Sequence, residues 1–401
     1  MRILFINQTF HPDPAATGQQ LADFSVDLAA RGWDVTVLTG RRGYAAKPQT
    51  LFPAREVYRG VKIFRVWPFT FGRANRIARI LDALFLNLSF GWRLMWLPRF
   101  DLIVAMTSPP LVGWIAMFFA KWCRSKFIYW MMDVNPDEAV EAGWIKEGSL
   151  GARFLGGILR LVLKGSNKVV VLDRFMKERI TVKGAVTEKI SVLPPWSHDE
   201  DIETIPHEKN PFRQKNLLDE KFVVMYSGNH SVCHPLDTLL GAARELREDK
   251  SLIFIFIGGG ERVKDVLYFK QEHNLSNVLH FSYQERSKLK YSLSAADLHT
   301  VVMGDPFVGI VHPCKIYGIL RVGRPFVYIG PRESTIGELI SGEHVGYQVN
   351  HGDVDGLVRV IREIRDLGAA KKEEIQAAEK RIADRYSRQV LSPRLADFIS
   401  C

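Results

Sequence analysis

Cysteine is scarce in this 401-residue chain, and its spacing excludes two kinds of small scaffold. The four cysteines lie far apart and form no Cys-x-x-Cys pair; they are Cys123, Cys233, Cys314 and Cys401. A disulfide framework requires more cysteines, and a structural zinc site requires closer spacing. We therefore expect a reduced cytoplasmic protein that holds no metal.

Long apolar runs are also missing. Residues 111–120 are apolar, but Lys121 ends the run, and a membrane span needs about 20 such residues. Residues 80–97 form a longer stretch, which Asp82 and Arg93 interrupt. The apolar stretch at the N-terminus is too short for a signal peptide and is typical of a first strand. The sequence thus predicts no transmembrane helix.

Acidic residues are rare between positions 41 and 100. This window holds twelve Lys or Arg and only two acids, Glu56 and Asp82, so it alone carries a charge equal to the chain's formal net charge of +10. Confined positive charge indicates one anionic partner surface rather than general solubility. A bilayer face and a nucleic acid are the two candidates.

Residues 73–99 favour the bilayer. Arg73, Arg76 and Arg79 have helical spacing, an apolar helical face accompanies them, and Trp92 and Trp96 follow. Basic residues beside a tryptophan-rich apolar stripe are typical of a helix on an anionic membrane surface. An ordinary core helix with a basic edge is the alternative. No nucleic-acid motif is present, so we expect no nucleic-acid partner.

Strands and helices alternate along the chain, which predicts an α/β protein with parallel sheets. Expected strands of the first half are 3–6, 34–38, 61–66, 101–106, 126–131, 168–172 and 190–193. Those of the second half are 222–226, 252–257, 278–281, 298–302 and 325–329. Four prolines interrupt the pattern and mark a linker. The expected parts are a first doubly wound domain at 1–195, a linker at 196–221, a second domain at 222–385 and a C-terminal helix at 386–401.

The dinucleotide fingerprint Gly-x-Gly-x-x-Gly is absent, yet glycine follows four strands of the second domain closely. Ligands of open parallel sheets bind at the carboxyl ends of strands, and glycine lets the backbone approach a phosphate. Pro313 is expected to begin a helix that Gly323 ends. Lys315 would lie in its first turn, where a cation beside a helix N-terminus favours a diphosphate.

Here the chain resembles the family 4 retaining glycosyltransferases, in particular the bacterial exopolysaccharide branch of colanic-acid type. The segments that carry the resemblance are Pro313-Cys314-Lys315-Ile316-Tyr317-Gly318 with Gly323-Arg324-Pro325, Tyr226-Ser227-Gly228-Asn229, Phe281-Ser282-Tyr283-Gln284, Ser294–His299, Met1–Ile6 with Thr17-Gly18, and Asp133 with Pro136. They extend through nearly the whole chain.

The resemblance implies a GT-B fold, in which two Rossmann-like domains face each other across a cleft. It implies a nucleotide-sugar donor, expected to be UDP-linked, in the C-terminal domain, and an acceptor in the N-terminal domain. The expected acceptor is a polyprenyl-diphosphate-linked saccharide. The enzyme would be a hexosyl- or N-acetylhexosaminyltransferase that needs no metal or cofactor. It would lie on the inner face of the cytoplasmic membrane.

The resemblance also implies the site. Catalytic roles are expected for Asp133, Lys315 and His234. The expected donor-binding residues are Gly18, Gly228, Asn229, Gly259, Tyr283, Gly309, His312, Lys315, Glu333 and Glu338. The chain departs from the family where glutamates usually stand, at Val308, Ile310 and Gly318. Asn229 and His234 occupy the positions of the usual Arg and Lys that hold the diphosphate.

Two alternatives keep the same fold. A sugar-nucleotide epimerase would need no lipid, so the basic and aromatic segment 73–99 favours a transferase. The missing glutamates are compatible with a non-catalytic member that binds donor or assembles a polysaccharide complex.

Overall fold

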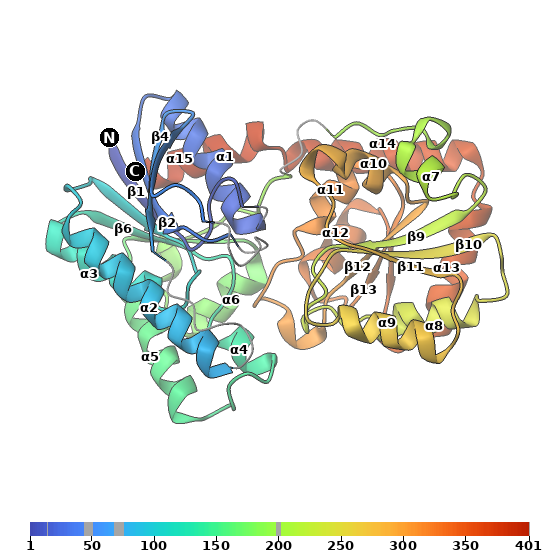
Figure 1. The fold of residues 1–401 in the computed structure, drawn as a ribbon, viewed down its shortest axis with the longest axis horizontal. Helices are drawn as coiled ribbons and strands as arrows, with labels where there is room; N and C mark the ends of the chain where they lie inside the picture. The colour runs from blue at the N-terminus through green and yellow to red at the C-terminus, as the bar shows by residue number, and fades with distance from the viewer. Residues whose placement is uncertain (14, 44–50, 68–75, 198–201, 401) are drawn as a thin grey trace. The chain divides into compact units, whose positions relative to one another are not determined.

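The computed structural model describes residues 1–401 except 14, 44–50, 68–75, 198–201 and 401, and it leaves the side chains of residues 76, 77 and 79 undescribed (Figure 1). The chain forms two compact units. Unit 1 comprises Met1–His198, Gly309–His312 and Leu391–Cys401. Unit 2 comprises Asp199–Val308 and Pro313–Val390. The path therefore returns to unit 1 twice.

Unit 1 contains an eight-stranded sheet of order β3-β4-β2-β1-β5-β6-β7-β8. Its strands are β1 (Arg2–Ile6), β2 (Asp34–Gly40), β3 (Arg55–Tyr58), β4 (Val61–Val66), β5 (Leu102–Ala105), β6 (Lys126–Trp130), β7 (Lys168–Val171) and β8 (Ile190–Val192). Its helices are α1 (Ala16–Ala30), α2 (Arg76–Met95), α3 (Val112–Cys123), α4 (Asp137–Glu141), α5 (Leu150–Gly165), α6 (Arg174–Val182) and α15 (Arg388–Ser400). All neighbouring strands are parallel except β3 and β4.

Unit 2 contains a six-stranded, wholly parallel sheet of order β11-β10-β9-β12-β13-β14. Its strands are β9 (Phe222–Ser227), β10 (Leu252–Ile257), β11 (Val278–Phe281), β12 (Leu298–Val302), β13 (Phe326–Ile329) and β14 (Tyr347–Val349). Its helices are α7 (Pro211–Lys215), α8 (Asp237–Glu245), α9 (Val263–Glu272), α10 (Leu289–Ser294), α11 (Lys315–Val322), α12 (Thr335–Glu343), α13 (Val354–Asp366) and α14 (Ala369–Arg385).

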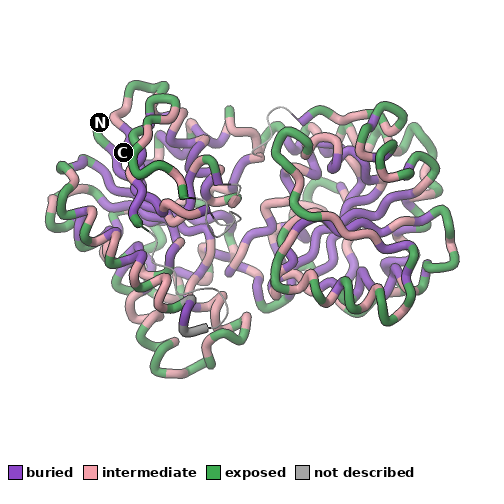
Figure 2. The backbone as a smooth tube through the Cα atoms, in the orientation of Figure 1, coloured by how far each residue is buried: buried purple, intermediate pink, exposed green. Residues whose placement is uncertain are grey.

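The central strands are largely apolar because helices cover both faces of a doubly wound sheet. Ile3 to Ile6 of β1 are fully buried, and the same holds for Phe254 and Phe256 of β10 (Figure 2). Side-chain caps set several helix starts, since Ser149 accepts from the backbone of α5 and Asp173 accepts from that of α6. The predicted two doubly wound α/β parts are thus confirmed.

The structure corrects the sequence prediction at three elements. The antiparallel edge strand β3 and the short edge strand β14 were not expected. The helix expected from Pro313 begins at Lys315, because the Ile316 amide donates to the Pro313 carbonyl in a tighter turn before the helix proper (3.2 Å). Gly323 ends this helix in the left-handed conformation (φ 60°), as predicted.

The stretch 196–221 is partly folded. Trp196 is buried in unit 1, where its ring lies 6.2 Å from that of Phe24. Arg213 of α7 is buried in unit 2 and donates to backbone carbonyls there. At the other end of the chain, α15 packs in unit 1, where Ser392 Oγ is hydrogen-bonded to the Asp27 carboxylate.

Within the residues that the structure describes, no helix combines the length and the hydrophobicity that crossing a bilayer requires.

Candidate functional site

Two glycine loops follow β9 and β10 in unit 2, and they pack against each other too closely to admit a side chain. Gly228 and Gly258 have φ angles of 149° and 134°. A Cβ on Gly258 would lie 2.0 Å from the Gly228 carbonyl oxygen, and one on Gly260 would lie 2.5 Å from the His230 carbonyl oxygen. Only glycine allows these two loops to pack so closely. They form the predicted glycine-rich edge of the second sheet.

Lys315 extends over the first of these loops. Its Nζ donates to Tyr226 Oη at 2.8 Å and lies 4.0 Å from the centre of the Tyr226 ring. A Cβ on Gly228 would lie 3.1 Å from Lys315 Nζ, so the ammonium stands directly against the glycine turn. The Tyr226 hydroxyl in turn donates to the Asn229 carbonyl at 2.7 Å. The tyrosine therefore holds the lysine above the turn.

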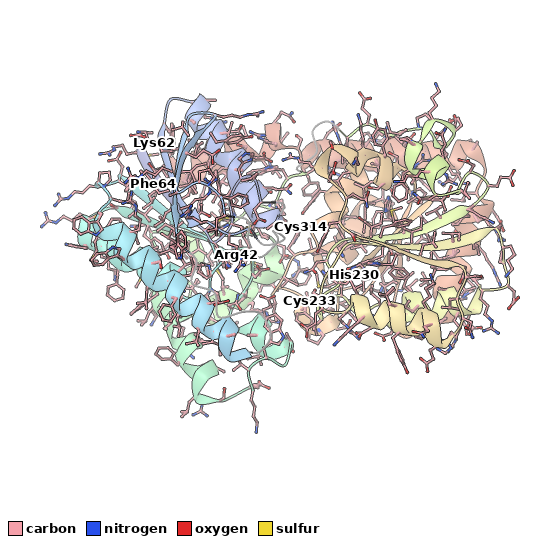
Figure 3. The ribbon with its side chains drawn as sticks, viewed as in Figure 1. Arg42, Lys62, Phe64, His230, Cys233 and Cys314 are labelled. Carbon is pink, nitrogen blue, oxygen red and sulfur yellow. The ribbon has the colours of Figure 1, made fainter. Side chains whose placement is uncertain are left out.

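Two histidines share this environment. Burial and the Lys315 charge lower the pKa of His230 to about 4, and the same causes hold the pKa of His234 well below its usual value. Burial also lowers the pKa of Lys315, to about 7. In the described part of the chain, no carboxylate acts on Lys315 at ion-pair distance, and buried Nδ1 of His234 has no hydrogen-bond partner. His230 and Cys233 follow β9, and Cys314 precedes Lys315 (Figure 3).

This arrangement suits an anionic ligand. A buried ammonium without a carboxylate is costly, and an anion would recover that cost by supplying the missing countercharge. The Lys315 pKa would rise on binding, because a negative group favours the charged amine. The strand-end glycines give a phosphate close access to the backbone.

The other expected donor residues of unit 2 lie in two places. Asn229 and Gly259 belong to the glycine loops, and the half-exposed Tyr283 covers Gly259, donating to its carbonyl at 3.2 Å. Glu333 and Glu338 are exposed on either side of Ser334, the residue that caps α12 after β13. The glycine-loop residues thus lie close to Lys315, whereas the two glutamates follow the end of β13.

Three expected donor residues belong to unit 1. Gly18 lies in the first turn of α1, where a Cβ would come within 3.2 Å of the Phe10 amide nitrogen. Gly309 has a φ of 70° and packs against the Phe175 backbone. His312 is buried, and its Nδ1 lies 2.8 Å from Asp173 Oδ2. This hydrogen bond anchors residues 309–312 in unit 1 and engages the His312 ring there.

Asp133 follows β6 in unit 1 beside a second carboxyl group. Burial raises the pKa of Asp133 well above its ordinary value, and the nearby Glu138 raises it further. Burial likewise raises the pKa of Glu138, which accepts a long hydrogen bond from Asn135 Nδ2 (3.5 Å). Two neighbouring half-buried carboxyl groups that cannot both easily carry a charge can share a proton near neutral pH. Such a pair can accept a proton from a hydroxyl group.

The expected membrane segment is described in part. Arg73 lies outside the described residues, and Arg76 and Arg79 begin α2 with side chains that are not described. Trp92 and Trp96 are 63% and 67% exposed, with ring centres 5.9 Å apart. The opposite face of α2 belongs to the core, because Leu86, Phe90 and Leu94 are buried there. The helix therefore serves both as core and as an exposed apolar stripe.

Sequence reasoning missed Tyr226, His230 and Glu138 as site residues. Tyr226 and His230 flank Gly228 by two residues on either side, so their closeness to a predicted strand end was a usable signal. Glu138 lies five residues after Asp133, and only the turn into α4 brings them together. Among the described residues, no group of His, Cys, Asp and Glu side chains is arranged to hold a metal ion.

Comparison with known proteins agrees with these features. Residues 16–196 match the family described as the glycosyl transferase 4-like domain. The chain is 24% identical over 384 residues to WcaI of Escherichia coli strain K12, named as a colanic acid biosynthesis glycosyl transferase, which covers 90% of this chain and 92% of that protein. It is 23% identical over 306 residues to WbjE of Pseudomonas aeruginosa, named as a probable glycosyltransferase, covering 75% and 76%.

Solved structures show the same fold. Alr3699/HepE of Anabaena in complex with UDP-glucose superposes with a TM-score of 0.72 at 17% identity, over 100% of this chain and 99% of that one. WaaG, a glycosyltransferase involved in lipopolysaccharide biosynthesis, superposes with a TM-score of 0.72 at 16% identity, over 99% of both chains. The predicted GT-B fold, with its two Rossmann-like domains, is confirmed.

Proposed function

We propose that this chain, whose residues 16–196 match the glycosyl transferase 4-like domain, transfers a hexosyl or N-acetylhexosaminyl group from a UDP-sugar to a lipid-linked saccharide, with retention of anomeric configuration. The acceptor is a polyprenyl-diphosphate-linked saccharide of bacterial surface polysaccharide synthesis. The enzyme works at the inner face of the cytoplasmic membrane.

The half-buried ammonium of Lys315, held against the Gly228 turn, is the observation that carries the proposal. It stands 3.1 Å from the position of a Gly228 Cβ, among two neutral histidines and without a carboxylate partner in the described residues. A nucleoside diphosphate supplies the countercharge that this lysine lacks. The relatives support the choice of donor, since HepE is solved with UDP-glucose.

The chain's own residues would act mainly on the leaving group. The bond between the sugar C1 and the β-phosphate oxygen breaks, and the acceptor oxygen forms a new bond to C1. Lys315 stabilises the negative charge that develops on the departing diphosphate, with His234 beside it. The proton of the acceptor hydroxyl passes to the UDP leaving group or to the Asp133–Glu138 pair. In this scheme no side chain forms a covalent bond to the sugar.

Unit 1 is proposed to bind the acceptor. Asp133 is its reactive group, because the raised pKa makes this carboxylate a competent proton acceptor once it is ionised. The exposed Trp92 and Trp96 support membrane attachment of the same unit, since tryptophan favours the lipid–water interface.

A nucleotide panel followed by an acceptor assay tests the function. UDP should raise the melting temperature most, since a ligand at a hundred times its Kd adds about 2.7 kcal/mol of stability. With UDP-sugars and polyprenyl-linked acceptor, the sugar should appear in the lipid fraction. An epimerised UDP-sugar formed without acceptor would instead identify an epimerase, and binding without turnover a scaffold. If no nucleoside diphosphate shifts melting, the donor site is wrong.

A further inference from the structure

Three helices of unit 1 present apolar side chains to solvent on one face of the sheet. Helices α2, α3 and α5 follow β4, β5 and β6, and each leads to the next strand in the same direction across the sheet. Right-handed crossovers place such helices on the same face. Helix α3 contacts both α2 and α5, so the three form one layer (Figure 1).

Each helix exposes a stripe of large apolar residues. The stripes consist of Ile80, Leu84, Leu88, Trp92, Met95 and Trp96 on or just after α2, of Trp114, Phe118 and Trp122 on α3, and of Leu150, Phe154 and Leu161 on α5. Their exposed fractions extend from 37% at Trp114 to 85% at Leu150. Scattered apolar residues are ordinary on a protein surface, but three adjacent stripes on neighbouring helices indicate an interaction surface.

The layer is firmly built beneath these side chains. The Asn87 amide of α2 donates to the Pro110 carbonyl just before α3 at 2.7 Å. Helices α3 and α5 approach so closely at Gly165 that a Cβ there would lie 2.2 Å from Met117 Sδ. The exposed stripes are therefore held by packed helices whose inner faces belong to the core.

Charge selects the occupant. The three helices carry seven Lys or Arg and a single acid, Asp82. Exposed basic side chains accompany the α3 and α5 stripes; they are Lys121, Arg153, Arg160 and Lys164. Four of the chain's nine tryptophans lie in the stripes. Apolar insertion, tryptophan and a basic border together are typical of a surface that binds anionic lipid.

We propose that α2, α3 and α5 together form a monotopic membrane-binding surface, which inserts Trp114, Phe118 and Trp122 as well as the α2 stripe among lipid headgroups. This inference extends the membrane attachment in the proposed function from one segment to a three-helix surface. A second copy of this chain would cover the apolar stripes equally well, but its basic residues would face the basic residues of the first copy and repel them.

Vesicle sedimentation of the full chain tests the surface. Wild type should bind vesicles that contain phosphatidylglycerol and bind pure phosphatidylcholine vesicles much less. The double variant F118E/W122E lies outside the α2 segment. It should lower the partition coefficient by about tenfold or more, because two aromatic side chains no longer insert into the lipid. The matched control L267E/Y268E changes two exposed apolar residues of α9 in unit 2 and should bind as wild type does.

Two further measurements make each outcome decisive. The rise in melting temperature that UDP causes should be the same in F118E/W122E and in wild type. This result would show that the variant is folded, and it keeps the test of the membrane surface separate from that of the donor site. Analytical ultracentrifugation should show a monomer in both proteins. The proposal is overturned if F118E/W122E sediments with vesicles like wild type, if L267E/Y268E is released equally, or if wild type is a dimer that F118E/W122E dissociates.

Discussion

Lys315 illustrates how a single residue can carry a binding site. Its ammonium is held between a tyrosine ring and a glycine turn, and burial lowers its pKa to about 7. In the free protein the charge is thus poorly stabilised, because burial removes part of its hydration and no carboxylate of the described residues lies within ion-pair distance. Burying the Lys315 charge lowers the stability of the free protein but favours the binding of an anion. Groups with strongly shifted pKa values are common at functional sites for this reason.

Replacing Lys315 should weaken UDP binding strongly. A charge-assisted hydrogen bond contributes about 1.5–3 kcal/mol, so Lys315→Ala should raise the Kd by roughly 10- to 150-fold. Lys290→Ala is the matched control, because Lys290 also lies over a tyrosine ring, at 5.3 Å from that of Tyr291. Isothermal titration calorimetry of the two variants gives the comparison. Equal affinities would remove Lys315 from the site.

The same lysine predicts a pH dependence. Since the pKa of free Lys315 is lowered to about 7, the amine loses its proton as pH rises through 7, and UDP affinity should fall between pH 7 and 9. Lys315→Arg keeps its charge over this range, so its affinity should vary little with pH. Titrations at pH 6.5, 8 and 9 measure the slope. A wild-type slope no steeper than that of the arginine variant would contradict the assignment.

Glu379 of α14 is buried, neither of its carboxylate oxygens is hydrogen-bonded to any described residue, and burial raises its pKa well above the usual value. Above about pH 4.3 the unfolded chain releases this proton while the folded chain retains it, so stability falls as pH rises. Glu379→Met should therefore raise the unfolding free energy, by about 1–3 kcal/mol at pH 7 and by less at pH 4. The exposed Glu373→Met of the same helix is the control, and urea unfolding at both pH values shows whether the gain depends on pH.

At the scale of elements, the short helix α7 seals the start of unit 2 through one buried side chain. Arg213 donates to the carbonyls of Ala295 and Leu218 at 2.7 and 2.6 Å and pairs with Asp297 at 3.1 Å. Asp297 also accepts from the Val223 amide at the beginning of β9. The guanidinium thus ties the connecting stretch to two central strands.

Arg213→Ala should destabilise unit 2 by about 3–5 kcal/mol, because it removes the cation that pairs with Asp297 and the guanidinium donors to buried backbone carbonyls. Arg244→Ala removes an exposed pair with Glu245 and should change stability by less than about 0.5 kcal/mol. Urea unfolding measures both variants. If the two behaved alike, α7 would be a linker without a structural role.

The sequence predicted the elements whose pattern is local and missed those that depend on distant partners. Strand 61–66 matches β4 residue for residue, since its apolar core side is legible in the sequence. Strand β3 has an exposed, charged pattern and exists because it pairs with β4. Arg213 looked like one more polar linker residue, because nothing local shows that carbonyls from residues 218 and 295 converge on it.

The candidate site divides in the same way. Gly228, Gly259 and Lys315 were predicted because glycine at strand ends and a cation at a helix start are visible in the sequence. Tyr226 was not predicted as a lysine partner, since its contact with Lys315 spans 89 residues. The burial of His312 against Asp173 was equally invisible, because it depends on a segment that joins unit 1 from far along the chain.

For the molecule as a whole, we expect transfer without a metal ion. The anion site in unit 2 offers an ammonium where metal-dependent enzymes place a cation, so Lys315 can offset part of the negative charge of the leaving diphosphate. Activity measured with a UDP-sugar and acceptor should persist in EDTA. The same enzyme preparation should be assayed in EDTA and again after manganese is added in excess. Complete loss that manganese restores would show a metal requirement.

The chain's two returns to unit 1 bear on how the protein can be dissected. A fragment that stops at residue 198 lacks Ile310, whose carbonyl accepts from the Val134 amide at 2.9 Å, and leaves the Asp173 carboxylate without His312. It also lacks α15, whose Phe398 carbonyl receives the Lys168 ammonium. Neither unit can therefore be produced by dividing the chain at one position. Removing about a dozen residues from the C-terminus would destabilise unit 1, to which those residues belong.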